Sequence, residues 1–221
     1  VKTIHHFTLT DYAPIQFRAR LMHPDHQLIV RNELDRMLAA NVVVPAESEW
    51  AFPILLADKP DGSYRFCVDF RRLNERMPKD SYPLPSIDEI LDSIRGSKYF
   101  SKIDLFSGYW QVRLSDECRN YATFICKYGA YSFNVTPYGL KNAPATFQRM
   151  MFEVFKDFPF VQVYMVDIVI FSSSRQEHVD HLSQVFDRLS EMGLRLKLPK
   201  CDFAKRSVAL LGHIEIGRAH V

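Results

Sequence analysis

Two aspartates within apolar, β-branched segments are the residues of this chain best suited to chemistry. Asp104 ends the segment YFSKID, and Asp167 lies in the middle of VQVYMVDIVIFS. An ionised carboxylate in such surroundings is costly unless it is exposed at a turn, paired with a cation or bound to a metal. For Asp167 taken alone, a plain structural position at the tip of a hairpin is the favoured interpretation.

The two aspartates can contribute to one site if their strands are neighbours in one sheet. Both carboxylates then meet at the same edge, and Mg²⁺ often binds a few carboxylates together with substrate phosphates. Two such ions can stabilise the attacking and the leaving oxygen of phosphoryl or nucleotidyl transfer. The sequence therefore makes Asp104 and Asp167 candidate metal ligands of a catalytic centre.

The β segments that must carry these aspartates are bounded by turn signals. Residues 161–172 are strand-forming, and Met165 and Val166 interrupt them weakly, which predicts a tight hairpin. A strand over 98–104 is expected to end at Asp104. Further strands are expected at the following positions: 42–44, 51–57, 64–68, 109–114, 122–126, 131–135, 194–198 and 207–211.

Four helices are predicted around these strands. They begin near Pro24, at the Ser86 capping box, near Pro144, and after residue 173, where Val179, Leu182, Phe186 and Leu189 are expected to form the buried stripe. Helices and hairpins alternate without a regular βαβ rhythm. The pattern therefore favours an α+β fold with an antiparallel sheet backed by helices.

The composition narrows the class of protein without identifying it. The chain has 221 residues, 47% of them hydrophobic, and a formal net charge of +2. We find no apolar run of membrane-spanning length and no signal peptide, so we expect neither membrane insertion nor secretion. Four widely spaced cysteines indicate neither zinc nor a disulfide framework. Basic clusters over 59–79 and 188–206 fit solvated faces, which are the commoner case, or phosphate-contacting surfaces, and composition does not decide between them.

Six motifs, in order, resemble the reverse transcriptases of gypsy-type LTR retrotransposons, from about residue 11 to 215. They are DGSYRFCVDFRRLN, YPLPSIDEIL, YFSKIDLFSGYWQVRL, TPYGLKNAPATFQRMM, VYMVDIVIFS and GLRLKLPKC, followed by LLGH. The resemblance implies the fingers and palm of a right-hand polymerase, with an antiparallel palm sheet. It also implies an RNA-directed DNA polymerase that extends a primer on an RNA or DNA template, using deoxynucleoside triphosphates (dNTPs) and two Mg²⁺ ions, or Mn²⁺.

The resemblance also divides the chain. We expect an N-terminal arm over 1–22, fingers with the start of the palm over 23–97, and palm over 98–215, with a returning fingers segment near 115–135. Residues 216–221, IGRAHV, look like a translated sequencing adapter and are expected to be non-native. The thumb, connection and RNase H regions of a Pol polyprotein are expected to be missing. By analogy we expect a cytoplasmic location within a virus-like particle.

Several residues match substrate-binding positions of the family. Lys59 and Arg65 match fingers residues that grip the triphosphate, a role suited to ammonium and guanidinium groups. Tyr109 matches the aromatic residue beneath the incoming sugar that excludes a 2′-hydroxyl, although a core aromatic is equally plausible. Tyr138 is a further substrate-binding candidate. Lys200 is a candidate proton donor to the pyrophosphate leaving group, although a solvated lysine is the default interpretation.

Other matches concern nucleic acid. Pro137 and Gly139 flank Tyr138 in the loop that lies under the templating base pair. The helix that follows carries template-contact candidates, for which helix capping is an equal alternative; these are Lys141, Asn142 and Gln148. Leu211 and Gly212 match the start of the element that positions the primer end. Asp69 and Arg71 are expected to hold the fingers together as an ion pair.

The chain departs from the family at its hairpin. The family reads Tyr-x-Asp-Asp, whereas this chain reads Tyr164-Met165-Val166-Asp167, so Val166 replaces the expected third metal ligand. Valine offers a cation no lone pair, and we expect impaired chemistry; a sequencing error is a competing account. A non-catalytic nucleic-acid-binding remnant is the alternative function. An unrelated metal phosphatase or nuclease would leave the fingers and helix motifs unexplained.

Overall fold

The computed structural model describes residues 3–59, 62–83, 85–210 and 213–216. These residues form two compact units, each assembled from segments that are distant in the sequence. Unit 1 comprises the described parts of Ser81–Gln111 and Pro144–Val221, and unit 2 comprises those of Thr3–Asp80 and Val112–Ala143. None of the helices described is long and apolar enough to cross a lipid bilayer.

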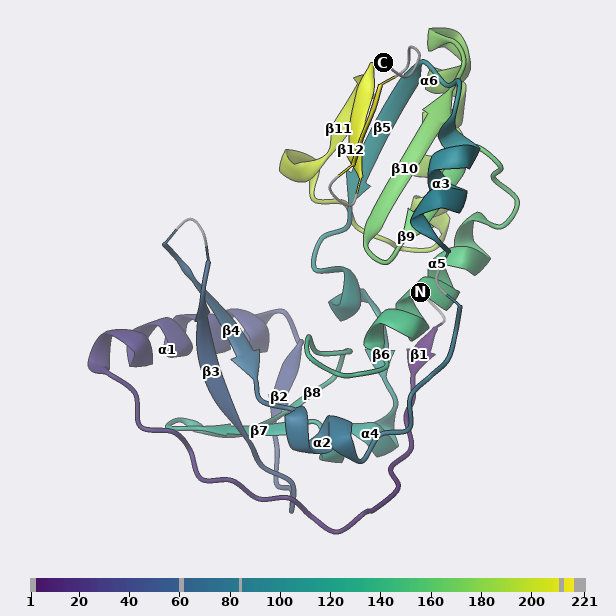
Figure 1. The fold of residues 1–221 in the computed structure, drawn as a ribbon. Helices are drawn as coiled ribbons and strands as arrows, with labels where there is room; N and C mark the ends of the chain where they lie inside the picture. Colours follow the sequence, from purple (N-terminus) through teal and green to yellow (C-terminus); the bar gives the residue numbers. More distant parts are fainter. Residues whose placement is uncertain (1–2, 60–61, 84, 211–212, 217–221) are drawn as a thin grey trace. The chain divides into compact units, whose positions relative to one another are not determined.

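Unit 1 is built on a four-stranded antiparallel sheet in the order β11-β5-β10-β9 (Figure 1). Its strands are β5 (Tyr99–Asp104), β9 (Val161–Tyr164), β10 (Asp167–Ser172) and β11 (Asp202–Lys205). A separate antiparallel pair joins β12 (Ser207–Leu210) to β13 (His213–Ile216). The predicted antiparallel sheet and the predicted hairpin are both confirmed.

Helices cover both faces of this sheet. On one face, α3 (Ile87–Ile94) packs Ile90 and Ile94 against Phe100 and Val169, and begins at the predicted Ser86 capping box. On the other face, α6 (Arg175–Glu191) contacts β5 and β10. Burial of these apolar side chains supplies most of the driving force for the arrangement, roughly 1.5–3 kcal/mol for each large one.

The buried stripe of α6 differs from the predicted one. Val179 and Phe186 are 55% and 38% exposed, and the buried positions are His178, Val185 and Leu189. The imidazole of His178 hydrogen-bonds to the hydroxyls of two sheet residues, which are Ser101 and Ser172. Leu189 is buried as predicted, whereas the prediction was wrong for Val179 and Phe186, because the polar His178 faces the sheet.

The strands predicted over 109–114 and 194–198 form only in small part. Residues 109–114 form a 3₁₀ turn, η1 (Gly108–Gln111), and only the two-residue strand β6 (Arg113–Leu114). Ser107 adopts a positive φ of 49°, which turns the chain out of the sheet direction. Residues 194–198 make one isolated bridge, Leu105 to Leu196, and lead into a second 3₁₀ turn, η2 (Leu198–Lys200).

Unit 2 holds a five-stranded sheet in the order β2-β8-β7-β3-β4. The strands are β2 (Val43–Pro45), β3 (Phe52–Asp58), β4 (Tyr64–Val68), β7 (Thr123–Cys126) and β8 (Gly129–Phe133). Its phenylalanines pack ring against ring: Phe52 on Phe70, Phe70 on Phe133, and Phe133 on Phe124. The sheet is mixed, because β3 and β7 run parallel.

The helices of unit 2 are α1 (Pro24–Ala39), α2 (Arg71–Glu75) and α4 (Asp116–Tyr121). The start of α1 and its stop at Asn41, which has a φ of 53°, agree with the sequence signals. The two short helices were not predicted. Within the expected arm, β1 (Ile4–His5) pairs in parallel with β6, and Gln16 forms a bridge to Ala51.

Candidate functional site

Asp104 and Asp167 lie directly opposite each other in the sheet of unit 1. They are Cα partners in the antiparallel pairing of β5 with β10. Partners in such a pair lie about 4.5–5.5 Å apart and direct their side chains to the same face. The predicted meeting of the two carboxylates at one end of the sheet is therefore confirmed.

The hairpin between β9 and β10 places Asp167 immediately after a two-residue turn. Tyr164 is the cross-strand partner of Asp167, and Met165 and Val166 form the turn. Met165 adopts a φ of 52°, a conformation that costs energy for a residue with a Cβ. Val166, the residue before Asp167, is aliphatic and 37% exposed.

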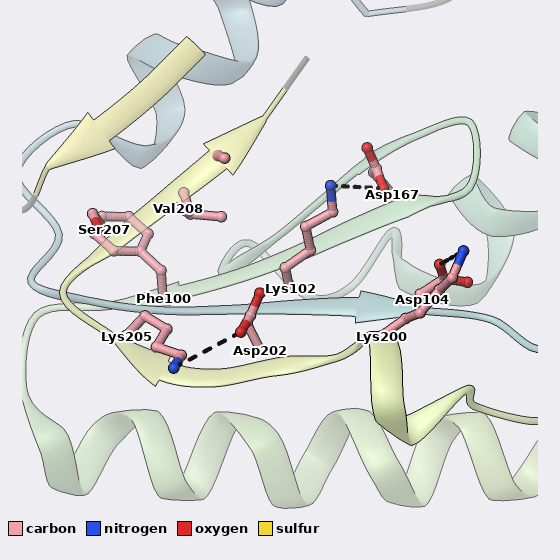
Figure 2. A pocket seen from close by; sticks show the side chains of 10 residues that line it. Phe100, Lys102, Asp104, Asp167, Lys200, Asp202, Lys205, Ser207 and Val208 are labelled. Atoms are coloured by element: carbon pink, nitrogen blue, oxygen red, sulfur yellow. Dashed lines mark ion pairs between the residues drawn. The ribbon is translucent and has the colours of Figure 1, made fainter. Parts of the chain in front are cut away.

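Each of the two aspartates is accompanied by one lysine. The Lys102 Nζ lies 3.0 Å from Oδ1 of Asp167, and the Lys200 Nζ lies 3.9 Å from Oδ2 of Asp104. Figure 2 shows the Lys102 side chain directed toward Asp167, with Lys200 beside Asp104. Lys102 lies two residues before Asp104 on β5, so the alternation of the strand puts both on one face.

A cavity of about 320 Å³ opens in front of these groups. Its polar part pairs three carboxylates with three lysines, since Lys205 lies 3.8 Å from Asp202. Figure 2 shows its lining residues, which are Phe100, Lys102, Asp104, Asp167, Lys200, Asp202, Lys205, Ser207, Val208 and Ala209. The charges balance, so the cavity offers oxygen ligands to a cation and ammonium groups to phosphate oxygens.

The backbone of Asp104 is fixed by the segment that carries Lys200. The Asp104 N–H donates to Sγ of Cys201 at 3.4 Å, and the N–H of Lys197 donates to the Asp104 carbonyl at 2.9 Å. The η2 turn then places Lys200 beside the carboxylate. Sequence reasoning missed Lys102, Asp202 and Cys201. Strand alternation was the available signal for Lys102, whereas nothing local revealed the other two.

Tyr109 packs on the helix α5 (Ala143–Phe155) within unit 1. Its ring meets the buried Phe147 edge-on, with centroids 5.4 Å apart. A Cβ at Gly108 would come within 3.2 Å of Phe147 and 3.5 Å of Val166, so this close approach favours glycine. Gln148, the next residue of α5, is buried and hydrogen-bonds to the hairpin rather than facing solvent.

The candidates of unit 2 lie on its hairpins and loops. The Lys59 Nζ hydrogen-bonds to Oγ of Ser63 in the connection between β3 and β4, and Arg65 is exposed on β4. The Pro137–Gly139 loop is held by Asn74 of α2, whose side-chain amide donates to the Gly139 carbonyl at 2.7 Å. Tyr138 in that loop is 41% exposed.

Lys141 and Asn142 hold the backbone of unit 2. The Lys141 Nζ donates to the carbonyl of Met77 at 2.7 Å. The Asn142 side chain donates to the carbonyl of Pro78 and accepts from the N–H of Asp80. Leu211 and Gly212, predicted to contact the primer, lie outside the described residues.

The carboxylate of Asp69, in unit 2, has a different environment from those of Asp104 and Asp167. Arg71 binds it through two hydrogen bonds of 2.8 Å, and Arg20 adds another of 2.8 Å. The hydrogen bonds from Arg71, aided by the charge of that guanidinium and by Arg20, lower the pKa of Asp69 to about 2. The predicted ion pair of Asp69 with Arg71 is confirmed, and Arg20 was not anticipated.

The donor set fits a divalent ion only in part. Two facing carboxylates can share one Mg²⁺ that is completed by water and substrate phosphates. Among the described residues, however, no group of three or more histidine, cysteine or acidic side chains is placed to hold a metal. The third carboxylate that the resemblance implies is absent because position 166 is valine.

The sequence of this chain is similar to a protein family and to the Pol polyproteins of two transposons. Residues 57–214 match the family model described as reverse transcriptase (RNA-dependent DNA polymerase). The Pol polyproteins of the transposons 297 and gypsy from Drosophila melanogaster are 36% and 35% identical, over 95% and 84% of this chain. The chain spans only 20% and 19% of their lengths.

Solved structures show the same fold. The prototype foamy virus protease-reverse transcriptase superposes with a TM-score of 0.89 at 28% identity, covering 98% of this chain and 29% of that one. A foamy viral protease-reverse transcriptase in complex with an RNA/DNA hybrid gives a TM-score of 0.89 at 25% identity, covering 97% and 29%.

Proposed function

The chain belongs to the reverse transcriptase family, and from this premise we propose that it is the aspartate-bearing part of an RNA-directed DNA polymerase, with chemistry impaired by Val166. We assign unit 1 to the palm and unit 2 to the fingers. One observation carries the proposal: Asp104 and Asp167 face each other across β5 and β10 and open into a cavity lined with lysines.

In this proposal, the side chains of unit 1 arrange the reacting groups. Asp104 and Asp167 would hold Mg²⁺, which when bound stabilises charge on phosphoryl oxygens as a Lewis acid. Lys200 lies where its ammonium can donate a proton or a hydrogen bond to a phosphate oxygen. Tyr109, fixed edge-on against Phe147, is assigned to the sugar of the incoming nucleotide.

The substrates follow by analogy with the relatives. The foamy viral protease-reverse transcriptase forms a complex with RNA/DNA hybrid, and we extend that class of partner to this chain. Lys59 and Arg65 are assigned to the triphosphate of a dNTP, and the Pro137–Gly139 loop and Lys141 to the template side. Binding through phosphates predicts an affinity for duplex that falls steeply as salt rises.

A non-catalytic nucleic-acid-binding function is the second candidate. It is favoured by the state of the two carboxylates, each of which already has an ammonium partner within 4 Å, and by the aliphatic residue at position 166. Loss of one charge-stabilising group of this kind costs on the order of 10²–10³ in rate. Both candidates predict duplex binding, and they differ in primer extension.

The deciding experiment restores the carboxylate. Val166→Asp should raise primer extension by a factor on the order of 10²–10³. It should also tighten Mn²⁺ binding measured by electron paramagnetic resonance on this chain. Val166→Asn is the matched control, since it has the size of aspartate without its charge, and it should change both quantities much less than Val166→Asp does. Equal extension and equal Mn²⁺ affinity in the original chain and the Val166→Asp variant would refute the proposal. If the original chain and Val166→Asp both bind duplex in a gel shift and neither extends a primer, the second candidate is favoured.

A further inference from the structure

Gln148 occupies an unusual position for a polar side chain. It lies on α5, is only 5% exposed, and meets the hairpin between β9 and β10. An uncharged amide buried in this way is tolerated only when both its donor and its acceptor are paired. Both are paired here, and both partners are backbone groups of the hairpin that carries Asp167.

The amide NH₂ group of Gln148 pairs with a backbone carbonyl at the open edge of the sheet. The Nε2 of Gln148 donates to the carbonyl of Val163 at 2.9 Å. Strand β9 is the last strand of the sheet, and Val163 is one pair beyond the Tyr164–Asp167 pair that closes the turn. In an antiparallel ladder, alternate residues direct their carbonyls away from the neighbouring strand, so Val163 needs a partner from outside the sheet.

The acceptor end of the amide holds the turn itself. The N–H of Met165 donates to Oε1 of Gln148 at 2.7 Å. Met165 is the residue with the positive φ of 52°, a conformation that persists in a non-glycine residue when the surroundings impose it. A hydrogen bond from a buried side chain is such a constraint. The same helix turn also contributes Phe147, which packs close to Gly108 beside Val166.

We propose that Gln148 is a positioning residue, which acts on the site by fixing the Met165 turn and thereby the carboxylate of Asp167, and is not a template contact. Asp167 follows the turn directly, so a change in the Met165 backbone moves Asp167 relative to Asp104. The structural part stands on the hydrogen bonds alone, whereas the catalytic consequence rests on the proposed function.

Two substitutions at Gln148 test the donor and the acceptor of its amide separately. Gln148→Met keeps the length of the side chain and removes both hydrogen bonds. Gln148→Glu keeps an acceptor for the Met165 N–H but loses the donor to the Val163 carbonyl. Glu153→Met is the matched control, because it introduces the same new side chain at an exposed position of the same helix.

The first readout is amide hydrogen exchange measured residue by residue by NMR. In Gln148→Met the Met165 amide should exchange about tenfold faster, the factor expected for the loss of one net hydrogen bond. Gln148→Glu should protect that amide better than Gln148→Met. The amides of Val169 and Phe171 within the ladder should keep their rates in all variants, as should every amide of the hairpin in Glu153→Met.

The second readout uses the Val166→Asp background, where chemistry is expected. Adding Gln148→Met should lower kcat for primer extension about tenfold or more, because a displaced metal ligand weakens transition-state stabilisation. The KM for dNTP and the gel-shift affinity for duplex should stay unchanged, whereas loss of a template contact would weaken duplex binding.

An unchanged Met165 exchange rate in Gln148→Met, or an equal rise at Val169 and Phe171, would overturn the proposal. If Gln148→Met does not fold, Gln148→Glu decides: it removes the donor to the Val163 carbonyl, so amide exchange around Val163 that stays as slow as in the original chain would also overturn the proposal. Failure of Val166→Asp to extend a primer would count against the proposed function, while the exchange experiment would still test Gln148.

Discussion

The carboxylates of the two units show how a partner decides what an aspartate can do. Asp69 in unit 2 is only 9% exposed and is held by the guanidinium groups of Arg20 and Arg71, both at 2.8 Å. Asp104 and Asp167 in unit 1 are 32% and 26% exposed, and each has one lysine, at 3.9 and 3.0 Å. All three lie at the ends of strands within prominent motifs.

The difference lies in the chemistry of the partner. A guanidinium is a planar fork that fills both oxygens of a carboxylate, and its charge is permanent. An ammonium is a compact charge on a flexible chain, and it can move aside when a stronger cation arrives. Asp69 therefore serves the structure, whereas Asp104 and Asp167 remain accessible to a ligand in their cavity.

The largest expected effect comes from neutralising an accessible carboxylate. In the Val166→Asp background, Asp104→Asn and Asp167→Asn should each reduce primer extension by a factor of at least 10²–10³, on the order found when one charge-stabilising group is removed. Their thermal unfolding should stay close to that of the parent, because both side chains are partly exposed. If Asp69→Asn lowered extension as strongly while fully folded, the distinction between structural and ligand-accessible carboxylates would fail.

The reverse effect is expected at Asp69. Asp69→Asn should lower the free energy of unfolding by about 1–3 kcal/mol, since it leaves guanidinium donors without their acceptor. Asp92→Asn is the control, because the Asp92–Arg95 pair is exposed and should contribute about 1 kcal/mol or less. Chemical denaturation followed by circular dichroism would measure both. A loss at Asp69 no larger than at Asp92 would contradict the structural role.

Asp69 also predicts a pH dependence. Its folded pKa of about 2 lies below the ordinary value of 3.8, so the unfolded chain binds the proton more tightly. The stabilisation is therefore present above about pH 4 and is lost as the pH falls through about 2. The stability difference between the original chain and Asp69→Asn should shrink over this range. A difference that stays constant from about pH 5 to about pH 2 would show that the carboxylate is not held in its charged form.

The parts of the fold that could be predicted from sequence are those fixed by local chemistry. The Ser86 capping box, the stop of α1 at Asn41 and the turn at Met165–Val166 each depend on a few adjacent residues. The pairing of Asp104 with Asp167 was a long-range prediction: it followed from the sequence only on the condition that the two strands are neighbours, the family resemblance supported it, and the strand register confirms it.

The parts that could not be predicted depend on contacts between distant segments. The η1 turn replaces a strand because the Gln111 side chain donates to the carbonyls of Phe106 and Arg195. The buried face of α6 includes His178 because Ser101 and Ser172 offer it hydroxyl partners. Short helices such as α2 and α4 bury too few residues for a hydrophobic period to be recognised.

The smallest expected effect tests whether the lysines beside Asp104 and Asp167 are exchangeable. Lys102→Met removes the ammonium 3.0 Å from Asp167, so Mn²⁺ should bind this chain more tightly, by a factor of about 2–5, the range for a partly exposed ion pair. Lys200→Met should have a weaker effect because its distance is 3.9 Å. Lys205→Met is the control, since that lysine lies against Asp202.

Rising salt should diminish the gain from Lys102→Met, because screening already weakens the competing ammonium. Electron paramagnetic resonance of free Mn²⁺ at two ionic strengths measures this change in Mn²⁺ affinity. Unchanged or weaker Mn²⁺ binding would mean that Lys102 organises Asp167 instead of competing for it. The carboxylates of unit 1 would then be held by their partners as firmly as Asp69 is, and the contrast between the two units would be one of geometry rather than accessibility to a ligand.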